Sequence, residues 1–284
     1  MNTPKLSLVV NYFNPSAISR VQAIATLCLE ALKDCTKCDL EVILSDGSGV
    51  ECPVIKACCE RLGFVYTVSP TPKNFEAIYN HGLAMARGEY VGILENDVFV
   101  VKDWDVPLFA EMERTGAALA VPYISSCDNH IQQTGFVARH VTFEPTNISH
   151  NIMVFDRRAL AAVYPLDTRF NANFNDNDMY VRIKRAGLKI IVVNCGGIVH
   201  YRGSSSAYNP WNPMAVDYEI FMGKYPELKT WRVGYGPYSF AEPLFCRSWT
   251  YRWLLKCCAA LPSRKLGLYA IKHAMRLEPF FHRV

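Results

Sequence analysis

The sequence contains no long hydrophobic run, although half of its 284 residues are hydrophobic. A transmembrane helix needs roughly 18 or more consecutive apolar residues, and the longest apolar stretches here are much shorter. The first residues also lack the charged and apolar segments of a secretory signal peptide. We therefore expect a protein that does not cross a membrane, and we predict a cytoplasmic location.

A disulfide framework is missing as well. The 11 cysteines are an odd number, and Cys58-Cys59 and Cys257-Cys258 are adjacent pairs, so reduced thiols are the favoured interpretation. The spacing Cys35-x-x-Cys38 could begin a zinc site, but no second pair follows at a matched spacing. We expect these thiols to be free.

Acidic residues are nearly absent from the C-terminal segment 244–284. This segment carries eight basic residues and one acid, Glu278, for a local charge of +7, whereas the remainder of the chain carries −3. Within 265–277 the basic residues share one side of a predicted amphipathic helix. We predict a basic helical extension that attaches to an anionic membrane surface. The alternatives are a helix packed on the rest of the protein and, less favoured, a nucleic-acid contact.

The chain also lacks internal repeats and low-complexity segments, so its length suits one large domain with an appendage. Short apolar runs rich in β-branched residues alternate with segments of helical length. The predicted strands are 6–10, 40–45, 64–68 and 90–94, and the predicted helices between them include 17–33 and 74–87. This alternation predicts an α/β fold with a mostly parallel sheet flanked by helices.

The pattern becomes less regular after residue 97. Further helices are predicted at 104–115, 157–163 and 178–186, and further strands at 117–123, 152–155, 189–193 and 198–201, whereas 125–150 has no clear pattern. A break in composition around 203–213 predicts a boundary near residue 205. We expect a catalytic domain over 1–205 and an aromatic, basic extension over 206–284.

Polar residues follow several of the predicted strands. Asn11 and Asn14 come after the first strand, Asp46 after the second, and Glu95-Asn96-Asp97 after the fourth. Side chains just beyond the carboxyl ends of parallel strands line the ligand crevice of such sheets. The carboxylates of Glu95 and Asp97 suit a hard cation that also binds phosphates. A turn that caps the next segment is the simpler alternative.

Four ordered motifs between residues 5 and 206 resemble glycosyltransferase family 2. They are Asp46-Gly47-Ser48, NFEAIYNHG at 74–82 with ARGEYV at 86–91 before the acidic triplet, FNDNDMYVR at 174–182 with RAG at 185–187, and His200 followed by Gly203-Ser204. The resemblance implies a GT-A fold, with a donor half over about 1–100 and an acceptor half over about 101–205. It also implies a nucleotide-sugar donor, a divalent metal such as Mn²⁺ or Mg²⁺, and transfer with inversion.

The resemblance assigns roles to individual residues. Asp97 would bind the metal and the diphosphate, with Glu95 in the first acidic position and His200 as a further metal contact. Asp176 would be the general base for the acceptor hydroxyl, although both Asp176 and Asp178 could instead only cap a helix. The predicted donor contacts are Asn11, Asn14, Asp46, Asn74, Asn80, Arg87 and Asn96.

Three positions depart from the family pattern. Tyr79 stands where the family often has Arg, Glu95 replaces the commoner Asp, and Asn175 replaces the Glu before the expected base. A diphosphate contact could then come from Lys73 or Arg87 instead. These substitutions leave the metal geometry and the nucleotide open.

The expected function is metal-dependent, inverting transfer of a sugar to a hydroxyl of a cell-envelope or lipid-linked glycan, at the cytosolic face of the inner membrane. One alternative is a glycosyltransferase that modifies a nucleic acid or a protein. The other is a catalytically degenerate module that binds a sugar nucleotide.

Overall fold

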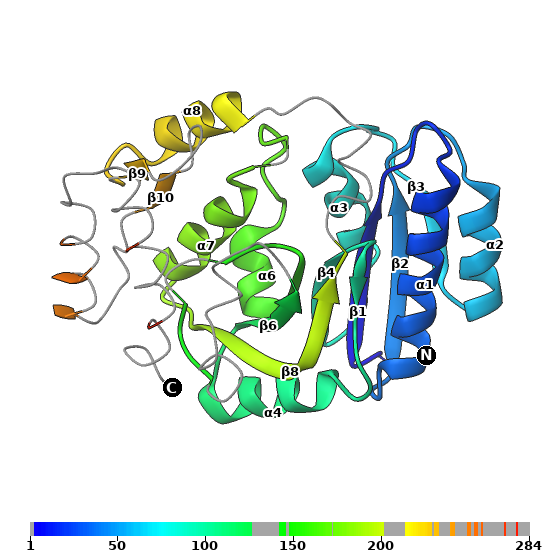
Figure 1. Cartoon of the computed structure of the whole chain (residues 1–284), viewed down its shortest axis with the longest axis horizontal. Coiled ribbons are helices and arrows are strands. Elements are labelled where there is room, and N and C mark those ends of the chain that lie inside the picture. Colours follow the sequence, from blue (N-terminus) through cyan, green and yellow to red (C-terminus); the bar gives the residue numbers. More distant parts are fainter. Residues whose placement is uncertain are drawn as a thin grey trace.

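The computed structural model describes residues 3–126, 142–145, 148–171, 173–201 and 214–228, with the backbone of 230–232 and 239–241 and a few single positions nearer the C-terminus. Its described strands form a central sheet in the order β3-β2-β1-β4-β7-β6-β8-β5 (Figure 1). The strand order reverses direction beside β1, and polar loops follow the strands there. Such a reversal is where α/β sheets bind ligands.

The first half of the chain alternates strands and helices, as predicted. In order, its elements are β1 (Leu6–Tyr12), α1 (Ser19–Cys35), β2 (Leu40–Asp46), α2 (Pro53–Leu62), β3 (Val65–Val68), α3 (Phe75–Leu83) and β4 (Tyr90–Glu95). These four strands are parallel to one another. Their carboxyl ends therefore lie on one edge of the sheet.

The second half makes the sheet mixed. Its elements are β5 (Val98–Phe99), α4 (Asp105–Thr115), β6 (Leu119–Ser126), β7 (Ile152–Phe155), α6 (Arg157–Val163), α7 (Asn175–Arg185) and β8 (Ile190–His200). β7 runs antiparallel to both β4 and β6, and β8 runs parallel to β6. The prediction of a mostly parallel sheet flanked by helices is confirmed.

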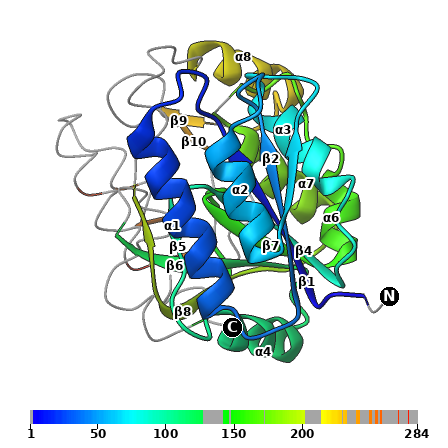
Figure 2. The same cartoon turned by 90° about the vertical axis from the view of Figure 1, so that its right-hand side faces the viewer.

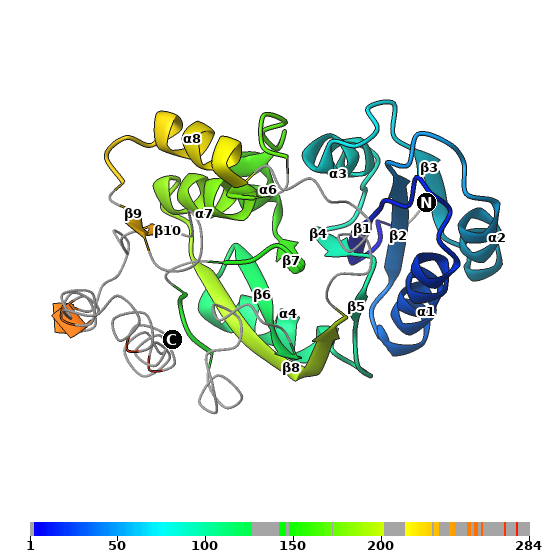
Figure 3. The same cartoon turned by 45° about the horizontal axis from the view of Figure 1, so that its top comes forward.

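Hydrophobic side chains cover both faces of the sheet. On β1, Leu8 and Val10 pack into the core beneath α1, α2 and α4, whereas Val9 between them packs into the core beneath α3, α6 and α7. This alternation follows from the two-residue period of a strand. Figure 3 shows the two helical layers on opposite sides of the sheet, and Figure 2 shows α1 and α2 side by side.

One predicted break in a strand is wrong. Residues 189–193 and 198–201 were expected to form two strands, but β8 is continuous through both. Gly196 and Gly197 lie inside it with φ values of 90° and 104°, a region that glycine alone adopts readily. The register with β6 shifts at the same level, so β8 bends there without ending.

Part of the chain beyond the predicted boundary at residue 205 packs against the residues before it. Helix α8 (Met214–Lys224) places Phe221, and Tyr225 and Leu228 just beyond it, in the core beneath α7, where each is at most 3% exposed. Figure 1 shows α8 lying along α7. After α8, the short strands β9 (Thr230–Arg232) and β10 (Ser239–Ala241) form an antiparallel pair.

No helix in the described part of the chain is both long enough and apolar enough to span a membrane. The predicted basic helix over 265–277 lies almost entirely outside the described residues. Trp249 and Trp253, however, are described and are 76% and 55% exposed.

Candidate functional site

Three ionisable side chains converge at the carboxyl edge of the sheet. Glu95 ends β4, Asp97 follows it in the turn to β5, and His200 ends β8. His200 Nε2 lies 3.0 Å from Glu95 Oε2 and 3.2 Å from Asp97 Oδ1. One potential ligand atom from each residue falls within 4.8 Å of the others. The predicted metal-binding residues therefore come together.

The antiparallel pairing of β5 with β8 brings His200 to this place. Val98 pairs with His200, and the backbone N–H of Tyr201 donates to the carbonyl oxygen of Asp97 at 2.8 Å. The bend at Gly196 and Gly197 directs the last part of β8 toward β5. The short strand β5 and the two glycines of β8 thus bring His200 next to the acidic turn, although His200 is distant in the sequence.

The donor set fits a divalent cation. Two carboxylates and an imidazole are ligands that Mn²⁺ accepts, and Mg²⁺ accepts the carboxylates. Burial opposes the ionisation of Glu95, but the hydrogen bond from His200 and the proximity of His150 outweigh it and lower the pKa of Glu95 to about 2. Glu95 is therefore a carboxylate at neutral pH, as a metal ligand must be.

Asp176, the predicted base, lies in the first turn of α7, whereas the predicted helix began two residues after it. Its Oδ1 accepts a hydrogen bond from the backbone N–H of Asn177 at 2.8 Å, and its side chain is 20% exposed. Burial raises the pKa of Asp176 and the charge of Glu95 adds to this effect, although His150 and the hydrogen bond from the Asn177 N–H oppose it. A raised pKa makes a carboxylate a better proton acceptor.

The residue before this turn has an unusual backbone. Phe174 adopts a left-handed conformation with φ of 59°, which costs a non-glycine residue about 1 kcal/mol. Its ring packs against Tyr218 and Phe221 of α8, with centroid separations of 5.6 and 5.4 Å. Packing against α8 offsets this cost and fixes the start of α7.

Asp217 of α8 holds the loop that leads to Phe174. This carboxylate is fully buried and accepts the backbone N–H groups of Asn171 at 3.0 Å and Asn173 at 2.9 Å. Helix α8 therefore supports the loop before Asp176, the predicted base, although α8 follows the predicted domain boundary.

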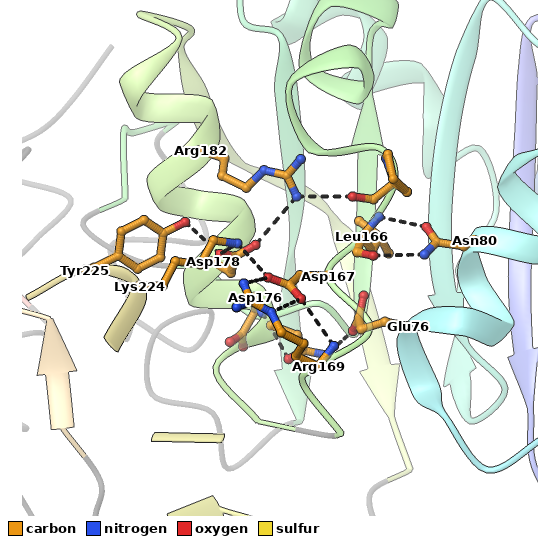
Figure 4. A network of polar contacts seen from close by, with 12 residues as sticks. Glu76, Asn80, Leu166, Asp167, Arg169, Asp176, Asp178, Arg182, Lys224 and Tyr225 are labelled. Atoms are coloured by element: carbon orange, nitrogen blue, oxygen red, sulfur yellow. Dashed lines mark hydrogen bonds and ion pairs between the residues drawn. The ribbon is translucent and has the colours of Figure 1, made fainter. Parts of the chain in front are cut away.

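Asp178 anchors α8 to α7. It accepts a hydrogen bond from Tyr225 Oη at 2.6 Å and lies 2.5 Å from Lys224 Nζ and 3.6 Å from Arg182 Nη1 (Figure 4). The carboxylate does not cap the helix, because α7 begins three residues earlier. Of the two aspartates considered from the sequence, Asp178 has the structural role.

His150 joins the metal residues to Asp176, and the sequence reasoning missed it. Its Nε2 lies 3.8 Å from Glu95 Oε1, and its Nδ1 lies 3.9 Å from Asp176 Oδ2. Because β7 runs antiparallel to β4, the residues before Ile152 lie opposite the end of β4. The sequence does show a histidine two residues before the predicted strand 152–155. Placing that histidine at the site, however, requires knowing that the strand runs antiparallel to β4.

Glu76 was missed too. It lies in the first turn of α3, is 1% exposed, and accepts a hydrogen bond from Asn175 Nδ2. Burial raises the pKa of Glu76 to about 8, although the Asn175 hydrogen bond opposes the shift. Figure 4 shows Glu76 projecting from α3 toward the first turn of α7. Nothing in the sequence around Glu76, which lies within a predicted helix, indicated its contact with Asn175.

Three of the predicted donor contacts lie at the carboxyl edge. Asp46 is fully buried, and its two oxygens accept from the Ser48 N–H at 2.8 Å and from Tyr66 Oη at 2.6 Å. Asn11 donates to the Phe75 carbonyl oxygen at 3.4 Å. Asn96 is 6% exposed, and its Nδ2 has no hydrogen-bond partner among the described residues.

Three other predicted donor contacts use their side chains to hold loops. Asn14 bonds to Ile18 through both ends of its amide. Asn74 caps α3 by accepting from the Ala77 N–H and donates to the Thr168 carbonyl oxygen. Asn80 makes a reciprocal pair with the backbone of Leu166 at 2.9 and 2.7 Å. The last two tie α3 to the loop that precedes the base.

Arg87 does not lie at the site. It precedes β4, at the amino edge of the sheet, and its guanidinium contacts Glu41 near the start of β2 at 2.6 Å. The prediction failed because Arg87 and Glu95 lie at opposite ends of β4. Lys73 is exposed on the carboxyl side, where its backbone N–H donates to the Gly47 carbonyl oxygen.

Comparison with known proteins agrees with this fold. The model of the family "Glycosyl transferase family 2" matches residues 16–177, more than half of the chain. No curated protein sequence matches.

Solved structures resemble the fold at low sequence identity. The mannosyltransferase PcManGT of Pyrobaculum calidifontis, in complex with GDP-Man and Mn²⁺, has a TM-score of 0.62 at 15% identity over 96% of this chain and 74% of that one. TarS of S. aureus has a TM-score of 0.57 at 13% identity, over 97% of this chain and 55% of TarS. GalNAc-T7 with UDP, GalNAc and Mn²⁺ has a TM-score of 0.59 at 12% identity, over 96% of this chain and 55% of GalNAc-T7. The chain spans about half the length of these last two.

The similar structures establish the α/β architecture, and the family match covers strands β2 to β7, the acidic turn and the start of α7. The chain therefore belongs to glycosyl transferase family 2 and is a nucleotide-sugar glycosyltransferase.

Proposed function

We propose that the enzyme transfers a sugar with inversion, that it requires Mn²⁺ or Mg²⁺, and that Asp176 is its general base. The observation that carries the proposal is the convergence of Glu95, Asp97 and His200 within reach of one ion. His150 lies between this cluster and Asp176. The similar mannosyltransferase and GalNAc-T7 structures contain Mn²⁺, which is consistent with this assignment.

The metal residues act on the leaving diphosphate of the donor, and Asp176 acts on the hydroxyl of the acceptor. Glu95, Asp97 and His200 would hold the ion, which supplies positive charge for the diphosphate that leaves. Asp176 accepts the proton of the attacking hydroxyl. The hydroxyl oxygen then attacks the anomeric carbon from the face opposite the diphosphate. This arrival from the opposite face produces inversion.

A turnover assay tests the proposal without a known acceptor. The full chain would be incubated with a panel of UDP-, GDP- and dTDP-sugars, and release of the nucleoside diphosphate would be measured with Mn²⁺, with Mg²⁺ and with EDTA. We expect at least one donor to be hydrolysed slowly, only with metal, and not by Asp97→Ala. Glu113→Gln, which alters an exposed carboxylate on α4, is the matched control.

Retention of full hydrolysis in Asp97→Ala would contradict the metal assignment. Donor binding without metal-dependent hydrolysis in the wild type would instead favour a degenerate sugar-nucleotide-binding module.

We propose further that the acceptor is a cell-envelope or lipid-linked glycan at the cytosolic face of the membrane. The excess of basic residues in 244–284 supports this, because each basic residue near anionic lipid contributes about 1 kcal/mol. Trp249 and Trp253 are exposed and lie four residues apart, and tryptophan favours the membrane interface.

Vesicle sedimentation tests the membrane contact. We expect the full chain to sediment with vesicles containing phosphatidylglycerol and to remain in solution with neutral phosphatidylcholine. The double variant Trp249→Ala/Trp253→Ala should bind more weakly. Equal sedimentation with both vesicle types, or salt-sensitive binding to a DNA duplex in the absence of lipid binding, would contradict this assignment.

A further inference from the structure

One nitrogen of His150 has no hydrogen-bond partner among the residues that the structure describes. Nδ1 is buried in a residue that is 8% exposed, and it lies 3.9 Å from Asp176 Oδ2. That separation is too long for a direct hydrogen bond. The ring also packs edge-on against Phe75, with centroids 4.8 Å apart, so the imidazole is held by packing.

The neighbouring amide assigns the tautomer of this imidazole. Asn175 Oδ1 accepts the backbone N–H of Asp176 at 3.0 Å, so the amide nitrogen of Asn175 faces the other way. There it contacts Glu76 Oε1 and His150 Nε2, the latter at 3.3 Å. An amide nitrogen can only donate, so Nε2 accepts and the proton of the neutral ring is on Nδ1.

Glu95 Oε1 also lies near Nε2, but at 3.8 Å it is farther than the Asn175 amide. The closer contact therefore favours a proton on Nδ1. The result is an N–H donor of His150 facing a carboxylate acceptor of Asp176 across 3.9 Å.

A single oxygen atom between these two groups could lie about 2.8 Å from each, a normal hydrogen-bond length. The group would have to accept from one neighbour and donate to the other. A hydroxyl does both, because it has one proton and two lone pairs.

We propose that His150 and Asp176 together bind the acceptor hydroxyl, with His150 Nδ1–H donating to its oxygen and Asp176 Oδ2 accepting its proton. The inference rests on the function proposed above. It adds His150 as a residue that contacts the acceptor, and Asn175 and Glu76 as positioning residues that fix the orientation and tautomer of His150.

The transfer step then balances as follows. The hydroxyl proton passes to Asp176, and the hydroxyl oxygen forms a bond to the anomeric carbon of the donor. The bond from that carbon to the nucleoside diphosphate breaks, and the diphosphate keeps the electron pair. His150 retains its proton throughout and leaves one lone pair of the hydroxyl directed at the donor.

Nitrogen NMR of the ¹⁵N-histidine-labelled full chain tests the tautomer without reference to activity. At pH 8 we expect the His150 signals, identified by their loss in His150→Asn, to report a proton on Nδ1. In Asn175→Asp the facing group is an acceptor, so the proton should move to Nε2. A wild-type ring protonated on Nε2, or no change in Asn175→Asp, would overturn the inference.

Activity of two matched variants tests the contact with the hydroxyl. The asparagine of His150→Asn can place an amide nitrogen near the position of Nδ1, whereas the longer glutamine of His150→Gln reaches the position of Nε2. With the donor that the panel identifies and water as acceptor, we expect His150→Gln to lower hydrolysis about 10-fold or more and His150→Asn to lower it about 3-fold or less.

Binding of Mn²⁺ with UDP or GDP should fall by less than the hydrolysis rate does in His150→Gln, because Glu95 keeps its closer contact with His200. His81→Gln is the control, since His81 contacts Thr67 Oγ1 at 2.8 Å on the donor half of the fold. Equal rates for His150→Gln and wild type, or a defect confined to nucleotide binding, would overturn the role of His150.

Failure of this inference is distinguishable from failure of the proposed function. If Asp97→Ala and Asp176→Asn lose hydrolysis while His150→Gln does not, only the role of His150 is wrong. If Asp97→Ala and Asp176→Asn both remain fully active, the proposed function is wrong.

Discussion

Asp97 Oδ1 lies 3.2 Å from His200 Nε2, although Asp97 follows the fourth strand of the sheet and His200 ends the last long one. The contact depends on the pairing of β5 with β8 and on the bend at Gly196 and Gly197. The geometry of the candidate metal site therefore depends partly on backbone segments that supply no metal-binding side chain, such as Gly196 and Gly197.

We expect Gly196→Ala to weaken both stability and metal binding. Alanine at this position would have to keep a φ of 90°, and its Cβ would meet Val101 Cγ2 at 3.2 Å, so Val101 or the strand must give slightly. Left-handed backbone costs an L-residue roughly 1–2 kcal/mol. Urea unfolding and Mn²⁺ titration measure the two effects. Gly116→Ala is the control, because its Cβ meets no atom within 4 Å although its φ is also positive. An equal loss of metal affinity in both variants would contradict the role of the bend.

Asp176→Asn should lower donor hydrolysis by about 10²–10⁴-fold, the usual contribution of a general base. The amide keeps the shape and the hydrogen bond from the Asn177 N–H, but it cannot accept the proton. Melting temperature and affinity for Mn²⁺ with nucleoside diphosphate should change little. A variant that loses nucleotide binding and rate in parallel would indicate that Asp176 binds the donor instead.

The sequence predicts the layered α/β fold because strand and helix periods alternate cleanly up to residue 97. The convergence of Glu95, Asp97 and His200 was also predictable, because the motifs that contain them are local. Local motifs do not show strand direction, so His150 was found only when β7 proved antiparallel. Arg87 was misassigned for a different reason, since the family motif suggested a donor contact although Arg87 precedes the predicted strand 90–94 and so lies at its amino end, beside Glu41.

Other contacts depend on tertiary packing that no local pattern reports. Asp217 holds the loop before Asp176 from a helix that composition alone assigned to a separate extension. Glu76 meets Asn175 only because the tertiary fold brings the first turns of α3 and α7 together.

Glu76→Gln should change the pH dependence of stability. The pKa of Glu76 is raised from 4.5 to about 8, so between these values the folded state holds a proton that the unfolded state releases. The wild type therefore loses stability as pH rises through this window. Since glutamine does not titrate, the melting temperature of Glu76→Gln relative to wild type should be higher at pH 8 than at pH 5. A difference that stays constant with pH would contradict the burial of a neutral Glu76.

Asp217→Ala should destabilise the protein and impair catalysis. It leaves the half-buried backbone N–H groups of Asn171 and Asn173 without their acceptor, and an unsatisfied donor costs up to about 1–3 kcal/mol when it is buried. Glu219→Ala, an exposed change on the same helix, should stay within about 0.5 kcal/mol of wild type in urea unfolding. If both variants unfold at the same urea concentration, α8 does not support the loop before the base.

Electron paramagnetic resonance of Mn²⁺, titrated with the full chain and a nucleoside diphosphate, tests the central assignment most directly. We expect one ion to bind per chain in the wild type and in Glu113→Gln, and we expect Asp97→Asn and His200→Gln each to weaken binding by about 10-fold or more. Unchanged Mn²⁺ affinity in both Asp97→Asn and His200→Gln would contradict a metal site at Glu95, Asp97 and His200.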